Sequence, residues 1–217
     1  MKFPRKKMLM MKRLPEKTIE RLSIYRRTLL NCLDQGRTHI YSHELAYMHN
    51  ITAVQVRRDI MFMGYASSQK KGYDVKELIK VISRILDTEK GSNVAIVGMG
   101  NLGRAITSYF VGKRPKLNIV AAFDNDPDKI GHVISGVKCH DVRNLQEIIK
   151  NQEIGIAILT VPTDYAVELA DKLILTGIKG LLNFTSISLN VPPHVCLEEY
   201  DMITSLEKVA YMVNRSA

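Results

Sequence analysis

Three glycines and an aspartate in this chain have the types and spacing of a nucleotide-binding site. Gly98, Gly100 and Gly103 form a Gly-x-Gly-x-x-Gly motif, and Asp124 follows about 20 residues later. The first glycine allows a tight turn, the second lets the backbone approach a pyrophosphate, and the third lets a helix pack closely on a strand. The carboxylate can accept hydrogen bonds from both ribose hydroxyls, and it repels a 2′-phosphate. The pattern therefore favours NAD(H) over NADP(H).

The sequence on both sides of the motif predicts the strand–helix–strand unit that it needs. Apolar runs at residues 94–97 and 119–123 are typical of buried strands, and a helical pattern begins between them. The N–H groups at the start of the helix, and the positive end of its dipole, would face the phosphates. The residues expected to bind the cofactor at this turn are Gly98, Met99, Gly100, Asn101, Leu102 and Gly103. A domain whose glycines serve packing alone, or one that binds coenzyme A, stays open as an alternative.

The chain after these strands predicts a parallel, doubly wound α/β sheet. A turn-rich loop leads to a helix near 145–149, a strand at 154–159, a helix at 164–176 and a strand at 180–184. Ligands bind such sheets at the carboxyl ends of the strands. The candidates by this position are Thr160, Val161, Pro162, Asn183 and Phe184, and each could equally be loop structure. Asp201 should cap a last helix, whose apolar surface should dock on its own domain or on a partner subunit.

Composition indicates a soluble globular protein with two small domains. The chain has 217 residues, 46% hydrophobic and 24% charged, and no apolar run reaches the ~18 residues needed to cross a membrane. The apolar stretch at 8–11 is too short for a signal peptide, so we expect a cytoplasmic protein without a membrane partner. Cys32, Cys139 and Cys196 lie far apart without metal spacing. No metal site is expected.

The net charge of +9 comes entirely from the first part of the chain. Residues 1–90 contain 19 Lys and Arg against 9 Asp and Glu, whereas residues 91–217 contain 12 against 13. Such asymmetry suggests a nucleic-acid-binding module joined to an ordinary globular one. On its own, the charge is equally compatible with a solvated face or a membrane-surface patch.

The basic half has the order of elements of a winged helix-turn-helix. Helices are predicted from Pro15 onward and over residues 43–49, where Ser42 supplies the cap. A third helix starts at a capping box, Thr52 to Gln55. This order favours a DNA-binding module in which the third helix is the recognition helix.

The segment after this helix, residues 64–73, suits a two-stranded wing with a basic tip, and Asp74 can cap a fourth helix. Of the two arginines on the third helix, one could read guanine and the other hold phosphate, while the wing lysines suit the backbone or the minor groove. The residues expected to bind DNA are Thr52, Gln55, Arg57, Arg58, Lys70 and Lys71. The alternative is a helical bundle used for dimerisation, with its arginines solvated.

These patterns divide the chain into five segments. They are a basic arm at 1–14, a winged-helix domain at 15–87, a linker at 88–92, a dinucleotide-binding domain at 93–200 and a C-terminal helix at 201–217. The linker is polar, as expected between domains.

From about residue 14 onward the chain resembles the Rex family of redox-sensing transcriptional repressors. The order and spacing of its segments carry the resemblance: Arg21-Leu22-x-x-Tyr25, Gln55-Val-Arg-Arg-Asp59, Gly72-Tyr73-x-Val75, Val97-Gly-Met-Gly-Asn-Leu-Gly103, Phe123-Asp124-x-Asp126-Pro127, Thr160-Val-Pro162, Gly177-Ile-Lys-Gly180 and Asn183-Phe184. The chain departs from the family pattern in the wing, at Ser67, Gln69 and Lys70, and also at Thr185-Ser186 and Ala166-Val167.

The resemblance implies an N-terminal all-α winged helix-turn-helix joined to a Rossmann domain, and a homodimer whose C-terminal helix is exchanged between subunits. It implies that the dimer binds a palindromic operator on double-stranded DNA and is released by NADH, while NAD⁺ competes poorly or supports binding. Arg27, Tyr109 and Asp201 match residues that couple the nicotinamide state to the DNA-binding domain. Tyr109 and Met202 are also expected to bind the cofactor, Met202 near the nicotinamide.

We therefore expect a repressor that senses the NADH/NAD⁺ ratio and is not an enzyme. One rival is an NAD-dependent oxidoreductase with a helical dimerisation domain. Against it, no clear acid or base lies near the nicotinamide end, and only about 90 residues follow Asp124. The other rival is a coenzyme A-binding module, since related doubly wound domains accept that ligand.

Overall fold

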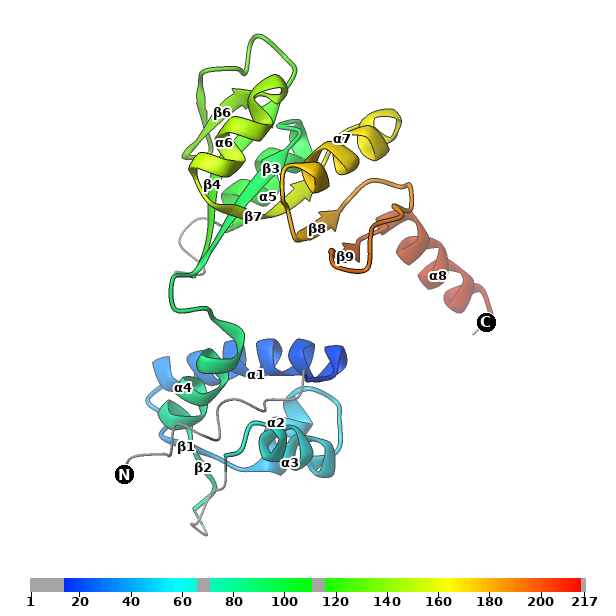
Figure 1. Ribbon diagram of the computed structural model, residues 1–217. Helices are drawn as coiled ribbons and strands as arrows, with labels where there is room; N and C mark the ends of the chain where they lie inside the picture. The colour runs from blue at the N-terminus through cyan, green and yellow to red at the C-terminus, as the bar shows by residue number, and fades with distance from the viewer. Residues whose placement is uncertain (1–13, 66–70, 111–115, 216–217) are drawn as a thin grey trace. The chain divides into compact units, whose positions relative to one another are not determined.

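The chain divides into two compact units, Met1–Glu89 and Lys90–Ala217. The computed structural model describes residues 14–65, 71–110 and 116–215 (Figure 1). The boundary between the units falls inside the predicted linker at 88–92. Most of the predicted basic arm, and the predicted DNA contact Lys70 with its neighbours Ser67 and Gln69, lie outside the described residues.

The first unit contains the predicted helices in the predicted order. Its elements are α1 (Glu16–Asp34), β1 (His39–Ile40), α2 (Ser42–Met48), α3 (Ala53–Phe62), β2 (Tyr73–Asp74) and α4 (Val75–Leu86). The helices bury one apolar stripe each, and the fully buried side chains include Leu22, Leu29, Leu45, Val56, Ile60, Leu78 and Ile82. Asp74 caps α4 as predicted, because its Oδ1 accepts the N–H of Glu77 at 2.8 Å.

The cap predicted for α2 is wrong. Ser42 does not cap α2: the cap position is Tyr41, whose N–H donates to Oε2 of Glu44 at 2.7 Å. Besides the helices the unit contains a short antiparallel pair, in which β2 pairs with β1, the strand before α2.

The second unit is built around a seven-stranded sheet. Its elements are β3 (Ser92–Val97), α5 (Asn101–Phe110), β4 (Leu117–Asp124), β5 (Val133–Ile134), β6 (Val137–Asp141), the 3-10 turn η2 (Val142–Asn144), α6 (Leu145–Asn151), β7 (Ile154–Leu159), α7 (Thr163–Leu175), β8 (Gly180–Asn183), β9 (Cys196–Glu199) and α8 (Met202–Arg215). The strand order is β5-β6-β4-β3-β7-β8-β9, and every neighbouring pair is parallel except β5 and β6.

This order confirms the predicted doubly wound sheet and fixes where a ligand could bind. The chain runs from β3 towards β4 and β6 and then returns to the other side of β3 through β7. The loops after β3 and β7 therefore lie side by side at the point where the strand order reverses, which is the ligand-binding crevice of such folds. The sequence patterns missed β5, which has two residues, β9, which is largely exposed, and β6, whose sequence alternates apolar residues with lysine and histidine and ends in aspartate.

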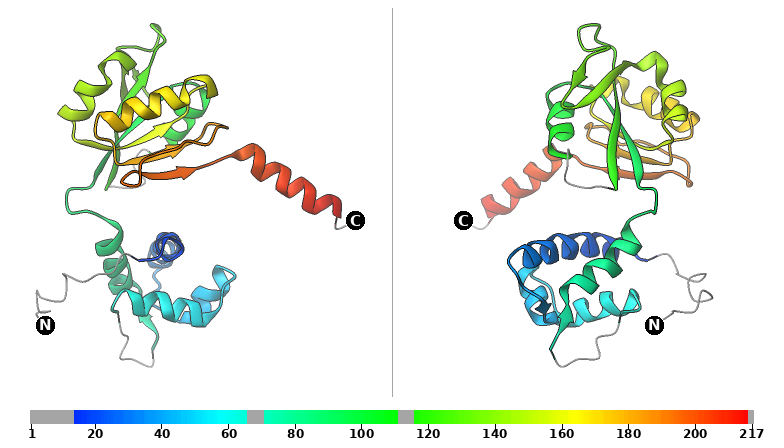
Figure 2. Two further views of the ribbon diagram at one scale, coloured as in Figure 1. Left: turned by 45° about the vertical axis from the view of Figure 1, so that its right-hand side comes forward. Right: turned by 90° about the vertical axis from the view of Figure 1, so that its left-hand side faces the viewer.

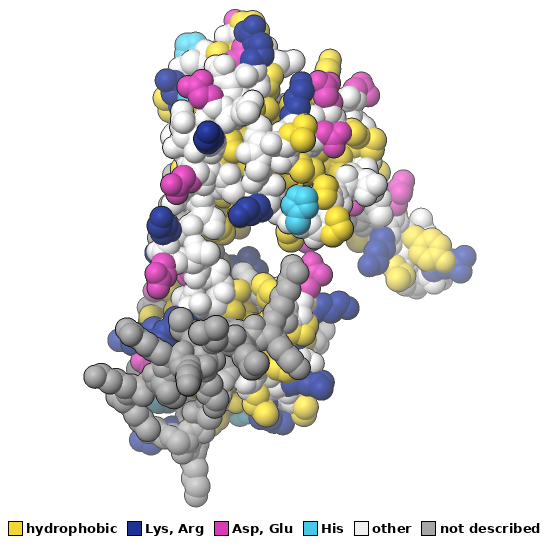
Figure 3. Space-filling view, viewed as in Figure 1, with side chains coloured by type: hydrophobic (Ala, Val, Ile, Leu, Met, Phe, Trp, Pro, Cys, Tyr) yellow, Lys and Arg dark blue, Asp and Glu magenta, His cyan; other side chains and the backbone are white. Residues whose placement is uncertain are grey.

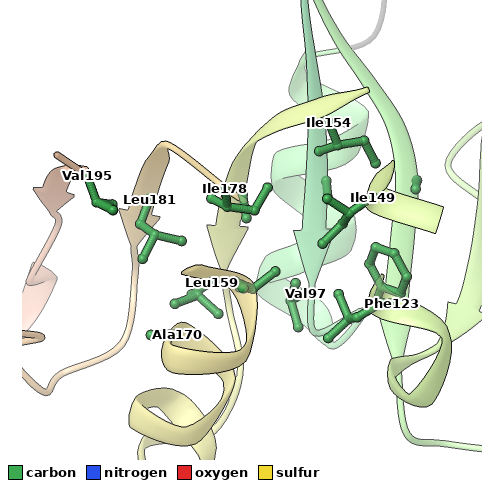
Figure 4. Packing of buried hydrophobic residues seen from close by; sticks show 14 residues of the cluster. Val97, Phe123, Ile149, Ile154, Leu159, Ala170, Ile178, Leu181 and Val195 are labelled. Atoms are coloured by element: carbon green, nitrogen blue, oxygen red, sulfur yellow. The ribbon is translucent and has the colours of Figure 1, made fainter. Parts of the chain in front are cut away.

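Both faces of the sheet are buried. On one face, side chains from β3, β4, β7 and β8 pack under α6 and α7, as Figure 4 shows for Val97, Phe123, Leu159, Leu181, Ile149 and Ala170. Alternate residues of β3, Val94 and Ile96, join the cluster on the other face, against which Ile106 of α5 packs. The central strands are therefore rigid supports for the loops at their carboxyl ends.

The C-terminal helix α8 is the exception to this packing. None of its described residues is buried, and Figure 2 shows it projecting from the sheet. Hydrophobic side chains are exposed along it beside lysine and arginine (Figure 3). Asp201 caps it as predicted, with Oδ1 accepting the N–H groups of Ile203 at 2.9 Å and Thr204 at 3.2 Å. Along the described part of the chain, no helix combines the length and hydropathy of a membrane span.

Candidate functional site

Two of the three motif glycines are required by packing within the protein. Gly98 has a φ of +99°, and a Cβ there would lie 2.7 Å from the carbonyl oxygen of Thr160. A Cβ at Gly103 would lie 2.0 Å from the carbonyl oxygen of Gly98. The loop after β3 is thus pressed against the end of β7, and α5 is pressed against the loop. These contacts agree with the roles predicted for the first and third glycines.

The middle glycine differs from the other two. A Cβ at Gly100 would meet no described atom within 4 Å, and its φ is not in the left-handed region. Packing and backbone strain therefore give no reason for glycine at this position. A ligand that approaches the backbone closely would give one, as the motif predicts. The first N–H groups of α5, next to Gly100, have no partner within the helix and can face an anion.

Thr160 fixes the shape of the glycine loop from the neighbouring strand. Its N–H donates to the carbonyl oxygen of Val97 at 2.9 Å, and its Oγ1 donates to the carbonyl oxygen of Gly98 at 2.7 Å. Val161 is half-buried beside Gly98, whereas Pro162 is exposed at the start of α7. Thr160 was predicted to contact the ligand because of its position at the end of β7. In the structure its hydroxyl holds the glycine loop in place.

Asp124 ends β4 with its carboxylate almost buried, at 7% exposure. Its Oδ2 accepts the N–H of Met99 at 2.7 Å and lies 3.2 Å from Nζ of Lys129, while its Oδ1 accepts the N–H of Asp126 at 3.0 Å. Burial lowers the pKa of Lys129, but hydrogen bonds to Asp126 and Asp124 outweigh it and raise that pKa. The acid thus ties the glycine loop to the loop at 125–131.

A hollow lies beyond the carboxyl ends of β4 and β6, whose last residues Asp124 and Asp141 are paired in register. Its volume is about 390 Å³, and it is lined by Asn125, Pro127, Ile130, Asp141, Val142 and Arg143. Oδ2 of Asp141 accepts a hydrogen bond from Nε of Arg143 at 2.9 Å, and this interaction lowers the pKa of Asp141. The apolar side chains among them, Pro127, Ile130 and Val142, suit a flat aromatic base. Sequence reasoning missed Asp141, Val142 and Arg143 as site residues because β6 was missed.

The candidates at the far side of the crevice are held differently. The amide of Asn183 is 1% exposed: its Oδ1 accepts the N–H of Thr185 at 3.0 Å and its Nδ2 donates to the carbonyl oxygen of Ile187 at 2.7 Å. It therefore shapes the loop after β8. The Phe184 ring stacks on that of Tyr200, with centroids 5.0 Å apart.

The remaining predicted residues lie on the surface of their own unit. Tyr109 on α5 and Met202 at the start of α8 are both exposed, and Asp201 serves as the cap of α8. Arg27 is exposed on α1, which belongs to the other unit. The coupling role of these residues stays a prediction.

The third helix carries the predicted DNA contacts. Oγ1 of Thr52 accepts the N–H of Gln55 at 3.1 Å, so the predicted cap of α3 is confirmed. The return arm of the capping box is not formed, because the Gln55 amide donates to Asp59 at 2.9 Å instead. Arg57 and Arg58 are both exposed, and Nη1 of Arg57 donates to Oγ of Ser42 at 3.3 Å. Lys71 is also exposed.

Asp59 is fully buried and joins α3 to α1. Its carboxylate accepts two hydrogen bonds from the Arg21 guanidinium, at 2.6 and 2.8 Å, and one from the Tyr25 hydroxyl at 2.9 Å. Burial raises the pKa of Asp59, but the hydrogen bonds from Arg21, Tyr25 and Gln55 outweigh it and lower that pKa. This Asp59 network fixes the rotation of α3, so that its arginines face outward.

Comparisons with known proteins match both units. Residues 13–60 match the family of putative DNA-binding protein N-termini, and residues 89–187 match the CoA binding domain family. The redox-sensing transcriptional repressor Rex of Desulfitobacterium hafniense is 40% identical over 201 residues, which cover 93% of this chain and 96% of that protein. The Rex repressor of Lactobacillus acidophilus is 35% identical with the same two coverages.

Solved structures agree with these relatives. The crystal structure of RSP in complex with beta-NAD⁺ and operator DNA has a TM-score of 0.87 and 36% identity, and covers 94% of each chain. RSP in complex with beta-NADH has a TM-score of 0.82 and 35% identity, and covers 94% of this chain and 96% of that one. RSP is a Rex-family repressor. The chain therefore belongs to the Rex family of redox-sensing transcriptional repressors.

Proposed function

We propose that this protein represses transcription in the cytoplasm as a homodimer, which binds a palindromic operator and leaves it when NADH occupies the Rossmann domain. The main support for cofactor binding is the empty space beside Gly100, in a loop whose other glycines are closely packed. A related repressor of 35–36% identity binds NAD⁺ and NADH in crystals, which supports the same ligand here.

Each part of the crevice suits one part of the dinucleotide. The N–H groups and the dipole at the start of α5 attract the pyrophosphate. Asp124, already fixed by Met99 and Lys129, would accept a hydrogen bond from a ribose hydroxyl. The hollow lined by Pro127 and Val142 would hold the adenine. Thr160 and Asn183 would act indirectly, by shaping the loops that face the ligand.

The nicotinamide supplies the signal, because its ring is positively charged when oxidised and neutral when reduced. A ligand shifts a two-state equilibrium only through different affinities for the two states. Tyr109 and Met202 are exposed on the Rossmann domain, and we assign them to contact with this ring. We assign to Arg27, Tyr109 and Asp201 the coupling between the charge of the nicotinamide and the DNA-binding domain.

The exposed apolar face of α8 supports a dimer. Its exposed apolar residues include Met202, Ile203, Leu206, Val209 and Val213, and none of the described residues of α8 is buried. A contiguous apolar face of this kind is typical of a protein interface. We infer that a second copy of this chain covers the helix, by exchange of α8 between subunits. A two-fold dimer would then place two α3 helices on two half-sites of a palindrome.

A gel shift with a library of palindromic operators tests the whole proposal. The protein is tested without nucleotide, with NAD⁺ and with NADH, and calorimetry compares NADH with coenzyme A. We expect specific binding that only NADH abolishes, and no heat with coenzyme A. Binding that neither nucleotide changes would contradict the sensor. Coenzyme A binding in place of NADH would support the rival ligand, and turnover of small hydroxy acids with NAD⁺ would support the rival enzyme.

A further inference from the structure

The outward face of α3 begins with an apolar residue. Val54 is the second residue of α3, and its side chain is 64% exposed. Arg57 and Arg58 follow three and four positions later, so they lie one turn further along the same face. The opposite face, with Val56 and Ile60, is buried. The outward face of α3 therefore presents a branched apolar side chain next to two cations.

Val54 has no evident role in the stability of the domain. A β-branched residue disfavours a helix slightly, and most of this side chain is in contact with water. The neighbouring Gln55, the polar side chain best suited to read adenine, is instead held by the buried Asp59. At the helix start, where a recognition helix contacts base edges, Val54 is thus the side chain that is free to do so.

We propose that Val54 reads the 5-methyl group of a thymine in the operator, next to a guanine contacted by one of the two arginines. This inference rests on the proposed binding of operator DNA by α3. Thymine is the base that offers an apolar group in the major groove, and an apolar side chain is its natural partner. The Asp59 network keeps Val54 in place, because it fixes the rotation of the helix.

The helix geometry limits where that thymine lies. Four residues of helix rise about 6 Å, whereas successive bases rise about 3.4 Å. The thymine read by Val54 therefore lies within about two base pairs of the guanine. In a palindromic operator it occurs once in each half-site, at symmetric positions.

The test begins with the operator that the full-length wild-type protein selects from a random library. Each thymine in turn is replaced by deoxyuridine, which lacks only the 5-methyl group, and affinities are measured for the wild type and Val54→Ala. Met61→Ala is the matched control, because Met61 is equally apolar, 74% exposed and two turns further along α3. Circular dichroism and NADH binding check that both variants are folded.

For the wild type, we expect one symmetric thymine position at which deoxyuridine weakens binding about fourfold per half-site, the effect of one buried methyl group. Val54→Ala should bind more weakly and lose this sensitivity, whereas Met61→Ala should keep it. Equal sensitivity in Val54→Ala and wild type, or no sensitive thymine at all, would overturn the inference and leave the repressor function intact. A wild type that selects no sequence would instead overturn the DNA-binding function on which it rests.

Discussion

Replacing Asp59 by asparagine should loosen the DNA-binding domain without touching the Rossmann domain. The carboxylate accepts two hydrogen bonds from Arg21, one from Tyr25 and one from Gln55, in a fully buried position. Asparagine has nearly the same shape but no charge, and its amide N–H₂ would face at least one of these donors. The variant therefore removes the charge of the network and opposes donor to donor.

The size of the effect follows from the exposure of the partners. Removing one side of a buried ion pair costs about 3–5 kcal/mol. The side chain of Arg21 is 23% exposed and can regain water, so we expect the lower end, about 3 kcal/mol. Tyr25→Phe removes one donor and should cost about 1 kcal/mol. Lys80→Ala breaks an exposed pair with Glu77 and should cost less than about 0.5 kcal/mol.

Hydrogen–deuterium exchange of the full-length protein measures this effect locally. A loss of 3 kcal/mol should lower protection in α1 and α3 roughly a hundredfold. Protection of β3 in the second unit is the internal control and should not change. Equal effects of Asp59→Asn and Lys80→Ala would refute the idea that the network holds α3 in place.

The same network predicts a dependence on pH. The pKa of Asp59 is lower in the folded protein than in the unfolded chain, so its contribution is complete above the unfolded value of about 3.9. The contribution is lost as the pH falls below that value through the folded pKa. Protection of α1 and α3 should therefore decrease in this acidic range, and Asp59→Asn should remove the part due to Asp59.

Three further predictions concern the second unit. Gly100→Ala should leave the melting temperature unchanged and weaken NADH binding at least tenfold. Gly103→Ala should instead destabilise the domain by about 3 kcal/mol, because its Cβ would lie 2.0 Å from a carbonyl oxygen. Thermal melts measure the stability of each variant, and calorimetry measures its affinity for NADH. Thr160→Val should cost about 1 kcal/mol by removing its hydrogen bond to Gly98, measured by urea unfolding. Leu206→Asp on α8 should give monomers in analytical ultracentrifugation; an unchanged dimer would exclude this helix from the interface.

The strongest local patterns were sufficient to predict the main elements. The glycine motif, the apolar runs at β3, β4 and β7 and the helix caps at Thr52, Asp74 and Asp201 all depend on neighbours within a few residues. Short-range hydrogen bonds and burial on both faces leave a clear signal in the order of residue types. The elements β5, β6 and β9 leave no such signal: β5 has two residues, β9 is largely exposed, and β6 contains polar residues and depends on pairing with β4.

The sequence by itself determined the fold class, the charged first half and the place of the nucleotide motif. Only the tertiary structure decided what each polar side chain does. The structure places the Gln55 amide on Asp59 and the Thr160 hydroxyl on the carbonyl oxygen of Gly98. The reason is physical: a side chain's role depends on which distant group satisfies it, and no local pattern records that partner.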